Sequence, residues 1–385
     1  MRAEKRAARL SKFDDFTKVA DYNSLYQAYK DARKGVRWKA SVQRYGMELS
    51  KNLCTLHNKL INGEDVRKGF IPFDLMERGK LRHIQSVHFS ERIPQKSLSQ
   101  NALIPILGNS LIYDNGASRK GMGISHAINR AIRHLREYYR HYGSEGYILQ
   151  IDLKDYFASI PHEPLKELLR EKFKDEKIIN LTYSFIDAFA QEKMRRARKE
   201  GIFLTKEECS VGLGLGSEIC QICAVAYPDS IDHYIKEKAR CRWYARYNDD
   251  SYVIHHSKVF LKELLNQIRA LYEAKGIRLN EKKTRIVKLS RGFTFLKTKF
   301  IITKTGKVIK RLCRKSVVTM RRKLKSFARF VQAGEMTTKQ AYDAFQSWIG
   351  YAMHKNSVTT VRNMKQLFRQ LFKGWERFPR LKGGY

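Results

Sequence analysis

Three aspartates have the residue type and the setting for metal-assisted chemistry. Asp249 and Asp250 are adjacent in YARYNDDSYVIHH (244–256), between two short apolar and aromatic runs that predict a β-hairpin. Asn-Asp is also ordinary turn chemistry, so a purely structural turn and a pair of metal ligands are both open interpretations. Asp152 ends YILQID (147–152), a run typical of a buried strand, and its side chain would be accessible at the strand end.

Such a trio would suit phosphoryl transfer. Divalent cations such as Mg²⁺ take oxygen ligands and keep positions open for phosphate oxygens. Two ions held by carboxylates stabilise the attacking and leaving oxygens of an in-line displacement. The three carboxylates meet if the strand ending in Asp152 and the hairpin carrying Asp249 are neighbours in one sheet.

The charge of the chain indicates a polyanionic partner. Its 385 residues include 76 Lys+Arg and 38 Asp+Glu, and the net charge of +38 is costly self-repulsion unless a polyanion neutralises it. The excess is concentrated, since residues 281–330 hold 18 Lys and Arg and a single acid, Glu281. A basic membrane-surface helix would need a broad apolar face, which this partly strand-like stretch lacks, so nucleic acid is the favoured partner.

Composition places the protein in a reducing compartment. No run of about 20 apolar residues and no signal-peptide core is present, which predicts a soluble, cytoplasmic protein without a membrane partner. Six cysteines are few for this length. CQIC (220–223) has no second Cys or His pair at zinc-finger spacing, so packing cysteines are favoured over a structural zinc.

Helices and strands must position these residues. The first 80 or so residues have a largely helical pattern, with an amphipathic stretch over 41–61 that NGED (62–65) ends. A more extended segment is expected over 70–89, and a further helix from Gln95. The basic loop DNGASRKGMG (114–123) precedes a basic helix that ends at Gly143. From 146 to about 302, the order strand, helices, hairpin, helix and strands predicts an α+β layer, and the tail is helical by pattern.

A series of motifs in order resembles those of reverse transcriptases, the right-hand polymerases with fingers, palm and thumb. The matching segments are GKLRHIQSVHFSERIPQKSL (79–98) and YDNGASRKGMG (113–123) for the fingers motifs of bacterial members, IDLKDYF (151–157) for motif A, GLGLGSEICQ (212–221) for motif B, YNDD (247–250) for motif C, GIRLNEKKTRIV (276–287) for motif D and RGFTFLKTKF (291–300) for motif E. The resemblance implies an N-terminal extension and fingers at 1–145, a palm with an antiparallel sheet at 146–305 that includes the motif B helix region 206–235, and a basic helical thumb at 306–385.

The resemblance also assigns residues to catalysis. Asp152, Asp249 and Asp250 would hold two Mg²⁺ ions, with the Leu153 carbonyl as a further ligand. Lys283, or its neighbour Lys282, would protonate the pyrophosphate leaving group. A surface lysine beside many others is the plain alternative at that position.

Further residues would bind the substrates. Arg119 and Lys120 would hold the triphosphate, and Gln221 would lie beside the nascent base pair. Phe157 would be the gate that leaves no room for a 2′-hydroxyl and so favours dNTPs. The plain alternatives are a solvated basic loop and a core aromatic. Nucleic-acid contacts are expected along the fingers, motif B, the primer grip and the first thumb helix, at Arg92, Gly216, Lys297, Arg321, Arg322 and Lys325.

The implied activity is RNA-directed DNA synthesis from an associated structured noncoding RNA, by a stand-alone bacterial or phage-encoded enzyme in anti-phage defence. Partners would be the template RNA, the DNA product and dNTPs, with a homo-oligomer or an accessory protein also compatible. Alternatives are an error-prone enzyme of a diversity-generating retroelement, non-templated or protein-primed synthesis, and an inactive RNA-binding protein with a polymerase fold. Gln221 matches the retroelement pattern, whereas Cys220 departs from it.

Overall fold

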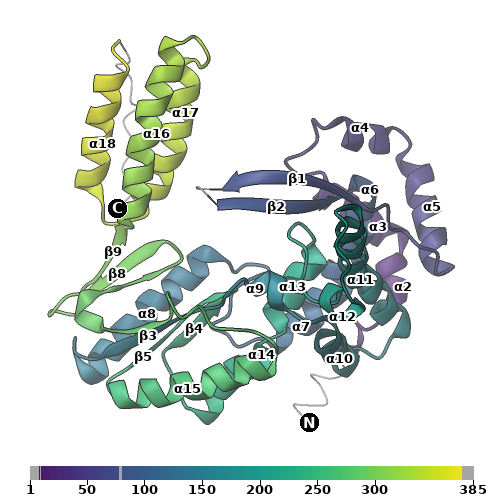
Figure 1. Ribbon diagram of the computed structural model, residues 1–385, viewed down its shortest axis with the longest axis horizontal. Helices are drawn as coiled ribbons and strands as arrows, with labels where there is room; N and C mark the ends of the chain where they lie inside the picture. Colours follow the sequence, from purple (N-terminus) through teal and green to yellow (C-terminus); the bar gives the residue numbers. More distant parts are fainter. Residues whose placement is uncertain (1–7, 9, 78–79, 375–385) are drawn as a thin grey trace. The chain divides into compact units, whose positions relative to one another are not determined.

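The computed structural model describes residues 8, 10–77 and 80–374 and is drawn in Figure 1. The fold is α+β, as predicted, with helices accompanying sheets of two, four and three strands. The chain forms two compact units. The first holds the described residues up to 127 with 151–253 and 259–285, and the second holds 128–150, 254–258 and the described residues from 286 on. Gly79, the first residue of a predicted fingers motif, lies outside the described residues.

The N-terminal part of the first unit is helical. Its helices are α2 (Phe16–Ala20), α3 (Tyr22–Ala32), α4 (Ala40–Met47) and α5 (Leu49–Ile61). The single helix expected over 41–61 is interrupted at Glu48, where φ is −114° and ψ is 40°. Asn52 spans the break by donating from its amide nitrogen to the Tyr45 carbonyl at 3.0 Å. The apolar pattern continues across this break, so it gives no sign of the interruption.

A β-hairpin and a long helical segment follow. Strands β1 (Phe70–Glu77) and β2 (Lys80–Val87) pair antiparallel, with Phe70 opposite Val87. Helix α6 (Phe89–Leu98) continues through a π-helix (Ser99–Leu103) into α7 (Ile104–Ser110). The expected helix start at Gln95 is wrong, because α6 begins at Phe89 and contains Pro94. Proline usually marks a helix start, which is why the sequence pattern misplaces this boundary.

The four-stranded sheet carries the predicted acidic residues. Its strands are β3 (Tyr147–Asp152), β4 (Tyr244–Tyr247), β5 (Asp250–His255) and β6 (Arg285–Lys288), in the order β4-β5-β3-β6. The strand ending in Asp152 is therefore a neighbour of the YNDD hairpin, as the metal-site interpretation requires. The helices that accompany it along the chain are α9 (Tyr156–Ser159), α10 (His162–Lys172), α11 (Glu176–Lys199), α12 (Lys206–Cys209), α13 (Glu218–Ala226), α14 (Asp229–His233), a π-helix (Tyr234–Lys238) and α15 (Lys258–Ala274).

The second unit contains most of α8 (Ile124–Tyr142), a three-stranded antiparallel sheet and a helical bundle. The sheet is formed by β7 (Phe293–Phe295), β8 (Thr298–Ile302) and β9 (Val308–Leu312), after a 3-10 turn (Leu289–Arg291). The bundle consists of α16 (Arg314–Gln332), α17 (Thr338–Met353) and α18 (Val358–Leu371). Buried Leu324, Phe345 and Phe368 pack in its core, with the two phenylalanine rings stacked at 5.2 Å. The predicted helical tail is confirmed for the part of it that the structure describes.

Candidate active site

The YNDD run forms the tip of a tight hairpin. Tyr247 pairs with Asp250, the first residue of β5, so the loop between the strands consists of Asn248 and Asp249. Asn248 has a φ of 55°, a left-handed conformation that asparagine tolerates better than most residues. The turn interpretation is correct, and the same turn presents Asp249 at the end of the sheet.

A buried ion pair supports this hairpin. Arg246 and Asp232 are both fully buried, and Nε and Nη2 of the arginine donate to the carboxylate at 2.8 and 2.7 Å. Tyr244 also donates its hydroxyl to Asp232, at 2.5 Å. Although burial alone lowers the pKa of Arg246, the carboxylate of Asp232 raises it well above its usual value. The polar atoms of the pair are well satisfied by hydrogen bonds, which a buried pair needs in order to be stable.

Arg246 connects the hairpin to helix α13 and to the basic loop. Its Nη2 donates to the Val225 carbonyl in α13 at 2.7 Å, and its Nη1 donates to the Asn248 carbonyl at the hairpin tip at 3.2 Å. Its backbone nitrogen donates to the Asp114 carbonyl at 3.3 Å, within the basic loop. Sequence reasoning missed this residue. A charged side chain inside the apolar run YARY was the available signal.

Asp152 is held by the segment of predicted motif D. Its backbone carbonyl accepts from the Asn280 nitrogen at 2.8 Å, and Leu153 forms a bridge with Leu279. The ammonium of Lys283 lies 2.9 and 3.0 Å from the two carboxylate oxygens of Asp152. The Lys283 side chain is 65% exposed and that of Asp152 is 21% exposed. Of the two lysines that the sequence offered, Lys283 is therefore the one that contacts Asp152.

The side chains at the end of the sheet are of the type that binds a hard divalent cation. Asp152 and Asp249 supply carboxylate oxygens, which Mg²⁺ prefers. The Asp152 carboxylate already holds a cation, the Lys283 ammonium, with both of its oxygens. Among the described residues, no three His, Cys, Asp or Glu side chains are grouped closely enough to form a metal site.

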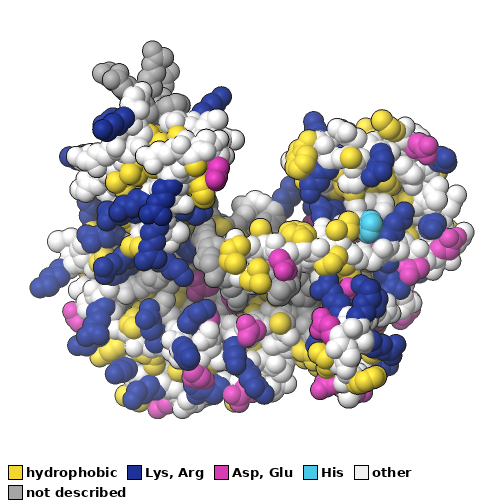
Figure 2. Space-filling model, turned by 45° about the horizontal axis from the view of Figure 1, so that its top comes forward, with side chains coloured by type: hydrophobic (Ala, Val, Ile, Leu, Met, Phe, Trp, Pro, Cys, Tyr) yellow, Lys and Arg dark blue, Asp and Glu magenta, His cyan; other side chains and the backbone are white. Residues whose placement is uncertain are grey.

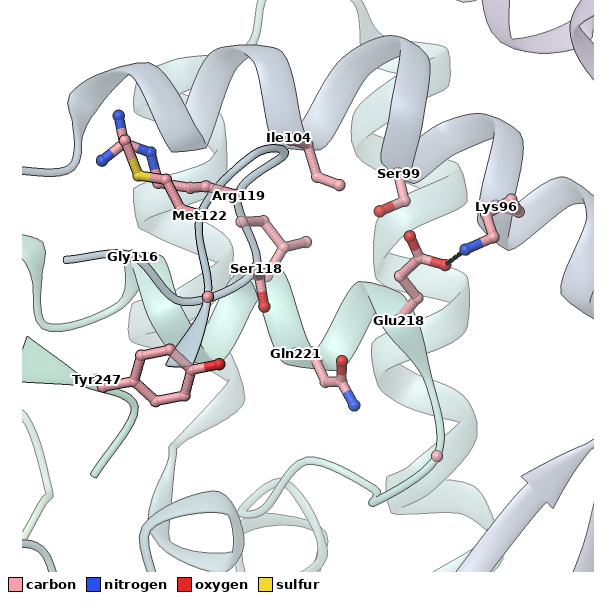
Figure 3. A pocket seen from close by; sticks show the side chains of 13 residues that line it. Lys96, Ser99, Ile104, Gly116, Ser118, Arg119, Met122, Glu218, Gln221 and Tyr247 are labelled. Carbon is pink, nitrogen blue, oxygen red and sulfur yellow. Dashed lines mark ion pairs between the residues drawn. The ribbon is translucent and has the colours of Figure 1, made fainter. Parts of the chain in front are cut away.

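A cavity of about 480 Å³ brings three of the motifs together (Figure 3). It is lined by Arg119 of the basic loop, Gly216 and Gln221 of predicted motif B, and Tyr247 of the hairpin. Lys96 of α6 and Glu218 of α13 form an ion pair at 2.6 Å in its wall, marked by the dashed line in Figure 3. Arg119 supplies this cavity with a guanidinium group, which is suited to binding a phosphate ester.

Arg119 and Lys120 differ in their settings. Arg119 is partly buried, and its Nη1 donates to the carbonyls of Ile112 and Asn115 at 3.1 and 3.0 Å. Burial lowers the pKa of its guanidinium, an effect that a bound anion would offset. Lys120 is exposed and is not among the described residues that line the cavity.

The glycines of predicted motif B are required by close packing. A Cβ on Gly214 would lie 1.6 Å from Cε1 of Phe189, so no other residue fits without movement. Gly216 has a φ of 123°, and a Cβ there would lie 3.1 Å from the Gln85 carbonyl oxygen. Cys220 of the same motif is fully buried, and burial raises the pKa of its thiol to about 12, as expected of a packing residue.

Phe157 lies beside this motif without lining the cavity. It is half-buried in α9, with its ring edge-on to Tyr156 at 5.6 Å, and its carbonyl accepts from the Leu213 nitrogen at 2.7 Å. The Tyr156 hydroxyl in turn donates to the Ala224 carbonyl. These contacts fix the predicted gate against motif B.

The remaining predicted residues lie elsewhere. Arg92 donates from Nη2 to the Ser86 hydroxyl at 2.8 Å. In the second unit, Lys297 has a φ of 59° and its carbonyl accepts from the Tyr351 hydroxyl at 2.9 Å. The α16 residues are exposed: Arg321, Arg322 and Lys325. Figure 2 shows Lys and Arg side chains outnumbering acidic ones on the face in view.

Comparison with known families decides the assignment. The model of the reverse transcriptase (RNA-dependent DNA polymerase) family matches residues 73–300, more than half of the chain. The chain belongs to the reverse transcriptase family. The family to which this reverse transcriptase belongs is described as one of RNA-dependent DNA polymerases.

Two solved structures resemble the reverse transcriptase at low identity. An apo telomerase from Candida tropicalis, truncated from its C-terminal domain, has 16% identity and a TM-score of 0.45 over 63% of this chain and 54% of its own. A telomerase from Candida albicans, in complex with a fragment of telomeric RNA, has 12% identity and a TM-score of 0.45 over 80% and 56%. This chain thus spans just over half the length of those telomerase chains. No curated protein matches it.

None of the helices in the described part is long and apolar enough to cross a membrane.

Proposed function

We propose that this reverse transcriptase copies an RNA template into DNA from dNTPs. The observation that carries the proposal is the cavity in which the basic loop, motif B and the YNDD hairpin converge. In this proposal, residues 1–145 act as N-terminal extension and fingers, 146–305 as palm and 306–385 as thumb.

In the proposed mechanism, Asp152, Asp249 and Asp250 hold two Mg²⁺ ions with help from the Leu153 carbonyl. The ions, when bound, would supply positive charge to the attacking and leaving oxygens. Lys283 moves from the Asp152 carboxylate and gives a proton to the departing pyrophosphate. Its present position within 3.0 Å of that carboxylate supports a role at the reacting atoms.

The substrate is held by the cavity. Arg119 binds the triphosphate, with Lys120 approaching from the exposed part of the loop, and Gln221 lies beside the nascent base pair. Phe157 excludes the ribose 2′-hydroxyl, since an aromatic face offers that group neither space nor a hydrogen bond. Its packing against Tyr156 supports a rigid gate.

Nucleic-acid contacts begin at Gly216 in the cavity wall and extend beyond the cavity. Arg92, Gly216 and Lys297, together with the exposed cations of α16, bind phosphates of template and primer without selecting a sequence. The template is a structured noncoding RNA and the biological setting is anti-phage defence in a bacterium or phage. The second candidate is an error-prone retroelement enzyme, which is favoured by the presence of Gln221 in the cavity wall.

The test is primer extension with an RNA template, dNTPs and Mg²⁺. Wild-type protein is expected to extend the primer, and Asp249→Ala with Asp250→Ala is expected to abolish extension. Lys262→Gln, an exposed change on α15, serves as the control. Extension that survives loss of both aspartates would refute the two-metal proposal, and error rates in the products separate the two candidate functions.

A further inference from the structure

Helix α8 carries an outward stripe that the proposed function does not use. Residues 129, 133, 136 and 140 are exposed, and their spacing of four, three and four residues places them on one face of the helix. Buried residues form the opposite face: Ala131, Leu135 and Tyr138. The stripe is Asn129, Arg133, Arg136 and Arg140.

A hollow of about 600 Å³ runs along this stripe. Among the described residues, its lining consists of the stripe with Ile132 and Glu137. Glu137 accepts from Nε of Arg133 at 2.7 Å, which orients that arginine along the helix. In the described part of the chain, Arg136 and Arg140 have no carboxylate partner, so their charges are available to a ligand.

The chemistry of the stripe is that of phosphate recognition. From Arg133 to Arg140 the helix rises about 10 Å, over which a nucleic-acid duplex presents about six phosphates. Guanidinium groups match phosphate oxygens with paired hydrogen bonds. The exposed large apolar residues described on α8, Ile124 and Tyr142, lie at its two ends, so the stripe lacks the apolar face that a membrane surface would need.

We propose that the α8 stripe binds the backbone phosphates of a double-helical part of the RNA that this enzyme copies. The inference rests on the proposed function for the identity of the nucleic acid. The stripe belongs to the second unit and the cavity to the first, so the two sites involve different residues throughout. The stripe would bind a folded region of the RNA while a single-stranded region of the same RNA is copied.

The experiment compares a double variant of the stripe, Arg136→Gln together with Arg140→Gln, with a matched double variant on α15. Lys258→Gln with Lys262→Gln also removes two exposed cations four residues apart on a helix. Binding of the full chain to a labelled RNA hairpin is measured against salt concentration. The arginine variant is expected to bind about 10- to 30-fold more weakly, with a salt slope smaller by about 2, because two phosphate contacts are lost. The lysine variant is expected to bind as wild type does.

Each outcome bears on the proposal. The proposal would be overturned if the two variants lose equal affinity for the RNA hairpin, or if the arginine variant binds the hairpin as tightly as wild type does. If the arginine variant loses as much affinity for duplex DNA as for the RNA hairpin, the assignment to RNA would be overturned. If it loses affinity only for phosphatidylserine vesicles or acidic peptides, the partner would be one of those instead. Extension on a short unstructured RNA template is expected to survive in the arginine variant. Wild-type protein that cannot extend such a template would count against the proposed function, whatever the hairpin binding shows.

Discussion

Replacing Lys283 by methionine tests whether the Lys283 ammonium competes with Mg²⁺ for the Asp152 carboxylate. In the structure the lysine occupies both oxygens of Asp152, so a divalent cation that binds there must displace it. The Lys283 side chain is 65% exposed, and solvent screening limits such a pair to about 0.5 to 1 kcal/mol. Removing the competitor should therefore tighten Mg²⁺ binding about two- to fivefold, while the loss of the proton donor slows nucleotide incorporation about 10- to 100-fold.

Two measurements on the same variant separate these effects. Titration calorimetry with Mg²⁺, in the absence of nucleic acid, gives the affinity, and single-turnover primer extension gives the rate. Lys282→Met is the matched control, since Lys282 is exposed and carries the same charge one residue away. Equal tightening in the two variants would show a general effect of charge and would refute the competition. Unchanged or weaker Mg²⁺ binding by Lys283→Met would refute it as well.

Three other changes have expected outcomes. Asp232→Ala leaves Arg246 buried without its partner and should lower the free energy of unfolding by about 3 to 5 kcal/mol in urea titrations. Glu163→Ala removes a 66% exposed carboxylate from Lys166, which keeps its second partner Asp187, and should change the free energy of unfolding by less than about 1 kcal/mol. Gly214→Ala should cost about 1 to 3 kcal/mol in the wild type and much less after Phe189→Ala; equal costs in both backgrounds would contradict the predicted overlap. Phe157→Ala should reduce the preference for dNTPs over rNTPs about 10- to 100-fold in competition assays, and unaltered discrimination would remove Phe157 from the gate.

Short sequence patterns predicted those features of the site that depend only on neighbouring residues in the chain. Asp152 at a strand end and Asp249 in a turn both follow from short runs of hydropathy and turn chemistry. The α+β order followed in the same way. The resemblance favoured Lys283 and kept Lys282 as the alternative, because only the folded turn decides which of the two reaches Asp152.

Contacts between segments that are distant in the sequence could not be predicted from such patterns. The partners of Arg246 come from the basic loop, α13 and α14, and no periodicity links these segments. Likewise, the sequence shows that motif B is rich in glycine, but it does not show that Phe189 covers Gly214. The interruption at Glu48 and the helix start at Phe89 were missed because apolar spacing and proline are weak guides to helix boundaries.

The buried pair of Arg246 and Asp232 has a practical consequence for work with this enzyme. The side chains that stabilise the hairpin lie three or more residues from Asp249 along the chain, and they are fully buried, so no substrate needs to contact them. The acidic tip can therefore be altered while the scaffold keeps its shape. Under the proposed function, an inactive form made in this way should retain a bound template RNA through purification, and the retained molecules can be sequenced to identify that template.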